Sequence, residues 1–307
     1  MSPGEIVMKG VLLPMAAGLV PLAVGTRIWR RDEGRSGIGA GLAIAVPTTL
    51  AVALWAQEGE AIWSLRQKWQ WLWVAACGAG VGAAAVGLML DRLAPRAPAV
   101  AMRSAVAIVI GLAAMLLLKA PGFEDARGRM IVLLAAAVPA WLAASSRRAI
   151  GREVDGALQS SPAAVPGWVQ GTCLWLAASG LSGVVLASGF AKLAVPLGAI
   201  AALSMAAAVL SLRGRRSLGA AGVAVAAGTL GMAAVLGWAY DDSPVAPWCF
   251  LAMPLALVAL AAPMPARGAV GSLLRITLVL VVVGIAAGVA VAESGMLAPR
   301  SAEAEQY

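Results

Sequence analysis

The feature that most constrains this chain is a series of long apolar segments, with nearly all charged residues confined to the stretches between them. Residues of the AVILMFWYC group make up 61% of the 307 positions, and only 12% are charged. A soluble domain carries roughly 25% charged residues, so too few charges remain here to cover a surface that faces water. Each long segment is instead suited to cross about 30 Å of hydrocarbon. The sequence therefore predicts an all-α, polytopic transmembrane helical bundle.

Ten apolar segments are predicted to be transmembrane helices, because a lipid-exposed backbone must satisfy its own N–H and C=O groups. The fifth segment is short and the loop before it is unexpectedly basic. The alternative is therefore that the chain crosses the membrane eight times and that the fourth and fifth segments form a re-entrant hairpin. The ten segments cover residues 7–26, 37–56, 70–90, 99–118, 130–146, 168–190, 193–212, 218–240, 248–266 and 269–292.

The segments form one integral membrane domain over residues 1–292, followed by a polar tail, 293–307, that we expect to be disordered. A polar connector at 147–167, rich in Ser and Pro, divides the domain into halves at 1–146 and 168–292. Five is an odd number, so two five-helix halves have opposite topology, as in inverted-repeat transporters. The halves show no clear residue-level similarity, and the repeat is a prediction from topology alone.

The distribution of basic residues predicts the orientation, since cytoplasmic loops carry an excess of Lys and Arg. With the N-terminus outside, the cytoplasmic loops hold 15 of these residues and the other side holds 8, which accounts for all 23. The loop at 241–247 has no basic residue and fits the outer side. We therefore expect a bacterial-type cytoplasmic (inner) membrane protein with both termini on the outer side.

The residue types present disfavour several functions. Basic residues lie in short clusters at segment ends and form no continuous face, which argues against nucleic-acid binding despite the net charge of +8. Histidine is absent, which removes HExxH zinc proteases and the usual haem and copper ligands. Acidic residues lie only near segment ends, in loops or in the tails, whereas ion-coupled carriers usually place a carboxylate or histidine at mid-membrane. No catalytic, metal-binding or cofactor-binding residue is predicted, and an enzyme is disfavoured.

Arg103 and Arg275 are the charges closest to the middle of an apolar segment. An arginine at the bilayer centre costs roughly 2.5–3.5 kcal/mol on the insertion scale. Each lies in the first third of its segment, where a long side chain reaches the headgroups by snorkelling. The sharper hypothesis is that one of them binds an anionic lipid headgroup or another anion.

Tryptophans and glycines indicate how the segments meet the lipid and each other. Most of the eleven tryptophans lie near segment ends, as in an aromatic belt, and residues 57–69 are suited to a short interfacial helix. Glycine pairs spaced for close helix approach occur at Gly37/Gly41, Gly78/Gly82 and Gly284/Gly288. Such pairs predict tight packing without naming a partner.

Two functional hypotheses follow. The first is a non-catalytic membrane component that contacts lipids and binds other membrane proteins, favoured by the lack of catalytic motifs and of charged residues at mid-membrane. The second is a transporter or permease for a small solute or lipophilic compound, favoured by the number of segments and by the prolines within them. The sequence does not specify a substrate, a partner or an oligomeric state.

Overall fold

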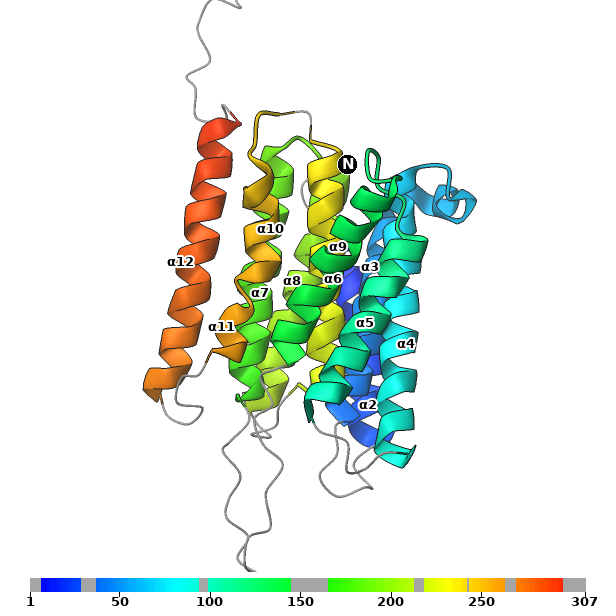
Figure 1. Ribbon diagram of the computed structural model, residues 1–307, viewed down its shortest axis with the longest axis vertical. Coiled ribbons are helices and arrows are strands. Elements are labelled where there is room, and N and C mark those ends of the chain that lie inside the picture. Colours follow the sequence, from blue (N-terminus) through cyan, green and yellow to red (C-terminus); the bar gives the residue numbers. More distant parts are fainter. Residues whose placement is uncertain are drawn as a thin grey trace, which may run out of the picture.

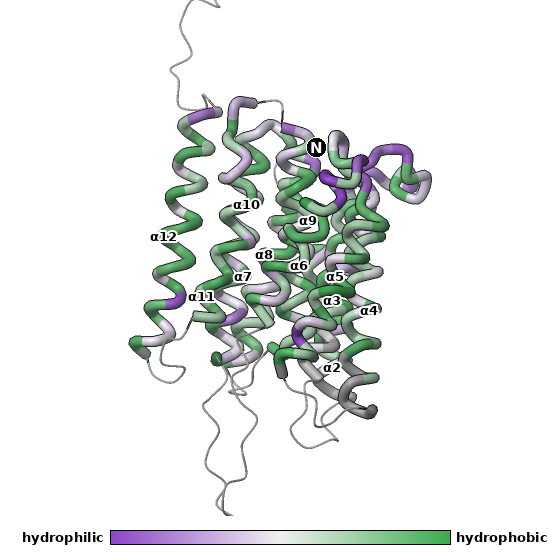
Figure 2. Tube along the Cα trace, viewed as in Figure 1, coloured by the Kyte–Doolittle hydropathy of each residue, from purple (hydrophilic) through white to green (hydrophobic). Residues whose placement is uncertain are grey.

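The helices lie side by side along the long axis of the molecule in the computed structural model, which describes residues 7–28, 37–93, 99–144, 165–212, 218–241, 243–262 and 269–294 (Figure 1). Within these ranges every regular element is helical. The elements are η1 (Met8–Leu12), α2 (Leu13–Ile28), α3 (Gly37–Glu58), η3 (Gly59–Ser64), η4 (Lys68–Gln70), α4 (Trp71–Leu93), α5 (Ala99–Leu117), α6 (Ala126–Ala144), α7 (Gly167–Ala187), α8 (Ala191–Leu212), α9 (Ala220–Ala239), α10 (Pro247–Leu255), α11 (Val258–Ala261) and α12 (Ala269–Glu293). Figure 2 shows the hydrophobic residues along the helices and a loop between α3 and α4 in which hydrophilic and hydrophobic residues are mixed.

The predicted transmembrane bundle is confirmed. Nine helices among the described residues are long and apolar enough to cross a membrane. They include α5 and α6, each of 19 residues, or roughly 28 Å at the helical rise of 1.5 Å per residue. These lengths favour two full crossings over a re-entrant hairpin for the fourth and fifth segments.

The ninth predicted segment is the exception, because it forms two short helices instead of one long one. Together α10 and α11 cover Pro247–Ala261, and they are separated at Ala256 and Leu257. Pro254 has no N–H to donate within the helix, and its ring displaces the preceding turn. The chain passes the break with shorter bonds, from Leu257 N–H to Pro254 O at 3.3 Å and from Leu260 N–H to Leu257 O at 2.9 Å. The proline thus explains why this segment is interrupted.

Helix α9 is the centre of the bundle. It contacts α3, α4, α5 and α6 from the first half of the chain, and α7, α8 and α10 from the second. All residues from Gly222 to Gly237 are buried, which matches a sequence that is apolar around its whole circumference. Helix α12 lies at one edge, where it contacts α7, α10 and α11 (Figure 1).

Small residues allow α9 to lie against its neighbours at short range. A Cβ added at Gly231 would overlap the Ala135 carbonyl oxygen of α6, and one at Gly228 would lie 3.3 Å from the Ala136 oxygen. Backbone-to-backbone contact of this kind provides the van der Waals packing that joins helices in lipid. Burial of apolar surface does not drive helices together there, because the lipid is as apolar as the helices.

Several predictions concern residues outside the described ranges. These include most of the connector 147–167, the tail after Ser294, and most basic residues of the predicted cytoplasmic loops. The orientation and the division into two halves therefore stay predictions.

Candidate functional site

Four segments that join consecutive helices meet at one end of the bundle, and the third of them includes the first two residues of α8. We call them the loop cluster: residues 59–70, 118–125, 188–192, and 240–241 with 243–246. Its centre is a row of aromatic rings. Trp69 lies edge-on to Phe190 with centroids 6.0 Å apart, and Phe190 stacks on Tyr240 at 4.8 Å. Phe123 lies edge-on to Trp238 at 5.0 Å. Because Trp69 is almost fully buried, these rings hold the loops together as a small apolar core at the end of the helices.

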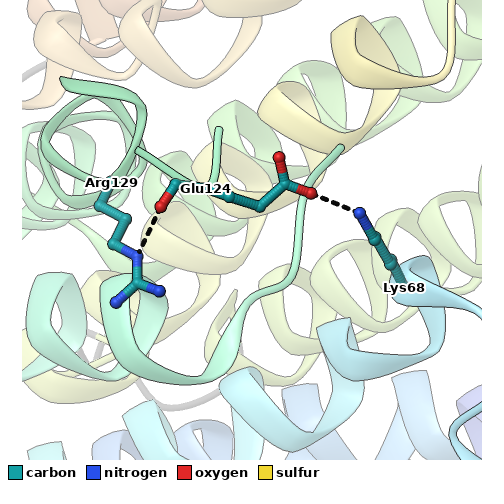
Figure 3. Close-up of polar contacts among 3 residues, drawn as sticks. All are labelled: Lys68, Glu124 and Arg129. Carbon is teal, nitrogen blue, oxygen red and sulfur yellow. Dashed lines mark hydrogen bonds and ion pairs between the residues drawn. The ribbon is translucent and has the colours of Figure 1, made fainter. Parts of the chain in front are cut away.

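Two ion pairs flank the aromatic row. The Lys68 ammonium pairs with the Glu124 carboxylate across two loops, and Arg129 donates to the Glu124 backbone oxygen at 3.1 Å (Figure 3). Lys192 pairs with Glu58 at 2.9 Å. The Lys68 side chain is 48% exposed and that of Glu124 is 58% exposed, and solvent-exposed pairs contribute little to stability. The Lys68–Glu124 pair therefore links its two loops but adds little to the stability of the fold.

The local environment shifts the pKa of Glu124 and that of Tyr240. The hydrogen bond from Lys68, reinforced by its charge, holds the pKa of Glu124 below its ordinary value. Burial raises the pKa of the Tyr240 phenol, against the opposing effect of its hydrogen bond with the Trp69 backbone. Glu124 therefore stays ionised and Tyr240 stays protonated at neutral pH.

The basic residues between α5 and the first turn of α6 ran against the predicted orientation, and two of them, Lys119 and Arg129, contact other groups of the protein. The Lys119 ammonium lies 3.7 Å from the centroid of the Trp71 ring, a cation–π contact. Arg129 donates to the Glu124 backbone oxygen, so both of these basic side chains contact groups of the protein itself. The sequence did not predict the contact of Lys119 with Trp71, because the two residues are some fifty positions apart.

The structure places Arg103 and Arg275 on different parts of the bundle. Arg103 is half-buried in α5, whereas Arg275 on α12 is only 3% exposed. Helices α5 and α12 lie near opposite edges (Figure 1). Their proposed contacts with an anion or a lipid headgroup stay predictions.

The guanidinium of Arg275 binds backbone oxygens. It donates from Nη1 to Gly271 O at 3.1 Å, one turn earlier in α12, and from Nη2 to Ala262 O at 3.3 Å, just after α11. A cation at the end of a helix complements its free carbonyls. Arg275 thereby joins α12 to the end of the interrupted ninth segment.

The three predicted glycine pairs differ in whether another helix of the bundle packs against them. A Cβ at Gly78 would lie 2.7 Å from the Leu117 side chain, and one at Gly41 would lie 2.9 Å from the Pro21 oxygen. These positions therefore pack α4 on α5 and α3 on α2. By contrast, Gly284 and Gly288 on α12 have no described atom within 4 Å of an added Cβ.

Within the described residues, no group of three or more His, Cys, Asp or Glu side chains is arranged to hold a metal ion. The fold and its apolar helices define the class to which this chain belongs, that of multi-pass membrane proteins. Comparison with protein-family profiles, curated proteins and solved structures finds no match.

Proposed function

We propose that the protein is a non-catalytic membrane component that binds another membrane protein through α12. The observation that carries this proposal is the open glycine face of that helix. Gly284 and Gly288 are one turn apart, and no described part of the chain covers them. Such spacing lets the backbone of a second helix approach closely.

The surroundings of the two glycines support a helix as the partner. Val281 and Ile285 are 50% and 58% exposed beside them. Branched side chains flanking a shallow glycine surface provide ridges for a second helix while losing little side-chain entropy. The opposite side of α12, with Val279, Ala286 and Ala290, is buried against the bundle. The helix is thus held on one side and open on the other.

The test is site-specific photocrosslinking in the native membrane. A photoreactive amino acid replaces Ile285, and the matched control replaces Val81, which is 69% exposed on α4. We expect a discrete protein–protein adduct from position 285 and only lipid adducts from position 81. The adduct should disappear in the Gly284→Leu, Gly288→Leu double variant if that variant accumulates normally. Lipid adducts alone at position 285 would contradict the proposal.

A transporter for a small solute or lipophilic compound is the second candidate, and the break between α10 and α11 is the observation that favours it. Interrupted helices form the substrate sites of many transporters by presenting unpaired backbone groups. Here the N–H groups of Ala256 and Leu257 are bonded, at 2.8 and 3.3 Å, which places this candidate second.

Accessibility of the break separates the two candidates. Ala256 and Leu257 are at most 3% exposed, so a cysteine at either position should resist an impermeant thiol reagent in a packed bundle. The background for this experiment is a variant without Cys77, Cys173 and Cys249. Rapid labelling at 256 or 257 would reveal a water-filled path and make transport the leading function.

A further inference from the structure

The loop between α3 and α4 extends sideways from the end of the bundle (Figure 1). Sequence reasoning predicts one interfacial helix at 57–69, whereas the structure has two short 3-10 turns, η3 and η4. Turn η3 forms the last six residues of one candidate membrane span, Gly41–Ser64, and the next candidate span begins at Lys68, after three intervening residues. The loop therefore lies near the depth at which the hydrocarbon core gives way to lipid headgroups.

The side chains of η3 divide between the protein and its surroundings. Ile62 is 1% exposed and anchors the turn to the core, whereas Trp63 is 61% exposed. The rings of Trp63 and of Trp73 on α4 pack edge to face, with centroids 5.5 Å apart and planes at 85°. The indole is thus fixed in place with most of its surface outward.

The backbone after η3 is held in an unfavourable conformation that sets this geometry. Leu65 has φ +47°, a left-handed conformation that is unfavourable for a residue with a Cβ. Two hydrogen bonds hold it, from Leu65 N–H to Ile62 O at 3.4 Å and from Trp71 Nε1 to Leu65 O at 3.3 Å. Arg66, which is exposed, directly follows this turn and is three residues from exposed Trp63.

We propose that this loop, residues 59–67, is an interfacial anchor seated in the phospholipid headgroups at this end of the bundle. Trp63 occupies the headgroup level with its indole N–H toward polar groups, the position that tryptophan favours in membrane proteins. Arg66 supplies a cation for the lipid phosphate, and no described residue forms an ion pair with it.

Continuity with the lipid-facing surface favours lipid as the occupant. Ile44 and Trp55 on α3 are 48% and 47% exposed, and Val81 on α4 is 69% exposed. Exposed apolar side chains on both flanking helices therefore lead up to the loop. An anionic phosphate beside Arg66 matches its charge, since a basic residue near an anionic leaflet contributes about 1 kcal/mol, or roughly fivefold in affinity.

Depth-dependent fluorescence quenching tests the anchor in the full chain reconstituted into phospholipid vesicles. An environment-sensitive fluorophore is attached to Trp63→Cys in the variant without native cysteines. The control is Ala126→Cys, at the exposed first residue of α6 at the same end of the bundle. We expect blue-shifted emission at 63, with stronger quenching by lipids carrying a shallow nitroxide than a deep one, and water-like emission at 126. Water-like, unquenched emission at 63, or stronger quenching by the deep nitroxide, would overturn the proposal.

A second measurement tests Arg66 with brominated lipids as quenchers. At position 63, brominated phosphatidylglycerol should quench more than brominated phosphatidylcholine, consistent with about fivefold local enrichment of the anionic lipid. Arg66→Gln should bring the two close to equality, while Arg127→Gln, which removes an exposed charge at the same end, should not. An unchanged preference in Arg66→Gln would exclude its role in binding the phosphate.

Discussion

Replacing Gly231 with alanine should destabilise the bundle, because α6 and α9 are in backbone contact at this position. In a helix, Gly→Ala ordinarily gains roughly 0.5–1 kcal/mol by reducing the freedom of the unfolded chain. At Gly231 the new methyl group would overlap the Ala135 carbonyl oxygen and crowd the Ala136 Cα at 3.2 Å. A backbone atom cannot rotate away as a side chain does, so the helices must separate. Overpacking of this kind costs about 1–3 kcal/mol.

The matched control is Gly183→Ala on α7, where the added methyl group meets no described atom within 4 Å. The assay is thermal unfolding in detergent, followed with a thiol-reactive dye, since the native Cys173 and Cys249 are fully buried. At roughly 2–4 °C per kcal/mol, Gly231→Ala should lower Tm by about 2–12 °C. Gly183→Ala should leave Tm unchanged or raise it. Equal Tm values for the two variants would refute close α6–α9 packing as the central contact of the fold.

Three further outcomes follow from individual contacts. Arg275→Gln should lower Tm in the same assay, because it removes a buried cation from two backbone oxygens, whereas exposed Arg66→Gln should not. Lys68 lowers the pKa of Glu124 in the folded protein. The contact therefore stabilises the loops fully at pH values above the unfolded pKa of about 4.3, and this stabilisation is lost as the pH falls through the lower folded pKa. Hydrogen exchange in loop 118–125, corrected for its intrinsic pH dependence, should therefore rise on acidification, and Glu124→Gln should abolish that response. Leu65→Asn should raise Tm by a few degrees at most, since asparagine tolerates the left-handed conformation better than leucine; a lower Tm would show that the Leu65 side chain contributes more than the strain costs.

The transmembrane helices were predictable because crossing lipid is a local requirement. Any segment that enters hydrocarbon must be apolar and must pair its own backbone groups, so about twenty residues suffice to identify it. The ninth segment shows the limit of this rule. Its hydropathy predicts one helix, whereas the missing N–H of Pro254 divides it into α10 and α11.

The environment of Arg275 was not predictable for a different reason. Its position in the sequence placed this residue near the membrane surface. It did not determine whether the guanidinium would contact lipid headgroups or other groups of the protein. Its partner Ala262 lies 13 residues away and follows the interrupted helix. Only the packing of α12 beside α11 brings the two together.

The sequence by itself determined that this protein is a helical membrane bundle and where most of its helices lie, because solvent preference and backbone pairing depend on neighbouring residues. The tertiary structure decided which glycines are covered and which are open, since Gly78 and Gly284 have the same local spacing but different neighbours. It also decided that loops distant in the sequence meet at one end through Trp69, Phe190 and Tyr240. Helices in lipid are apolar on nearly every side, so hydrophobicity does not select their contacts; shape complementarity does, and it exists only once the helices are assembled.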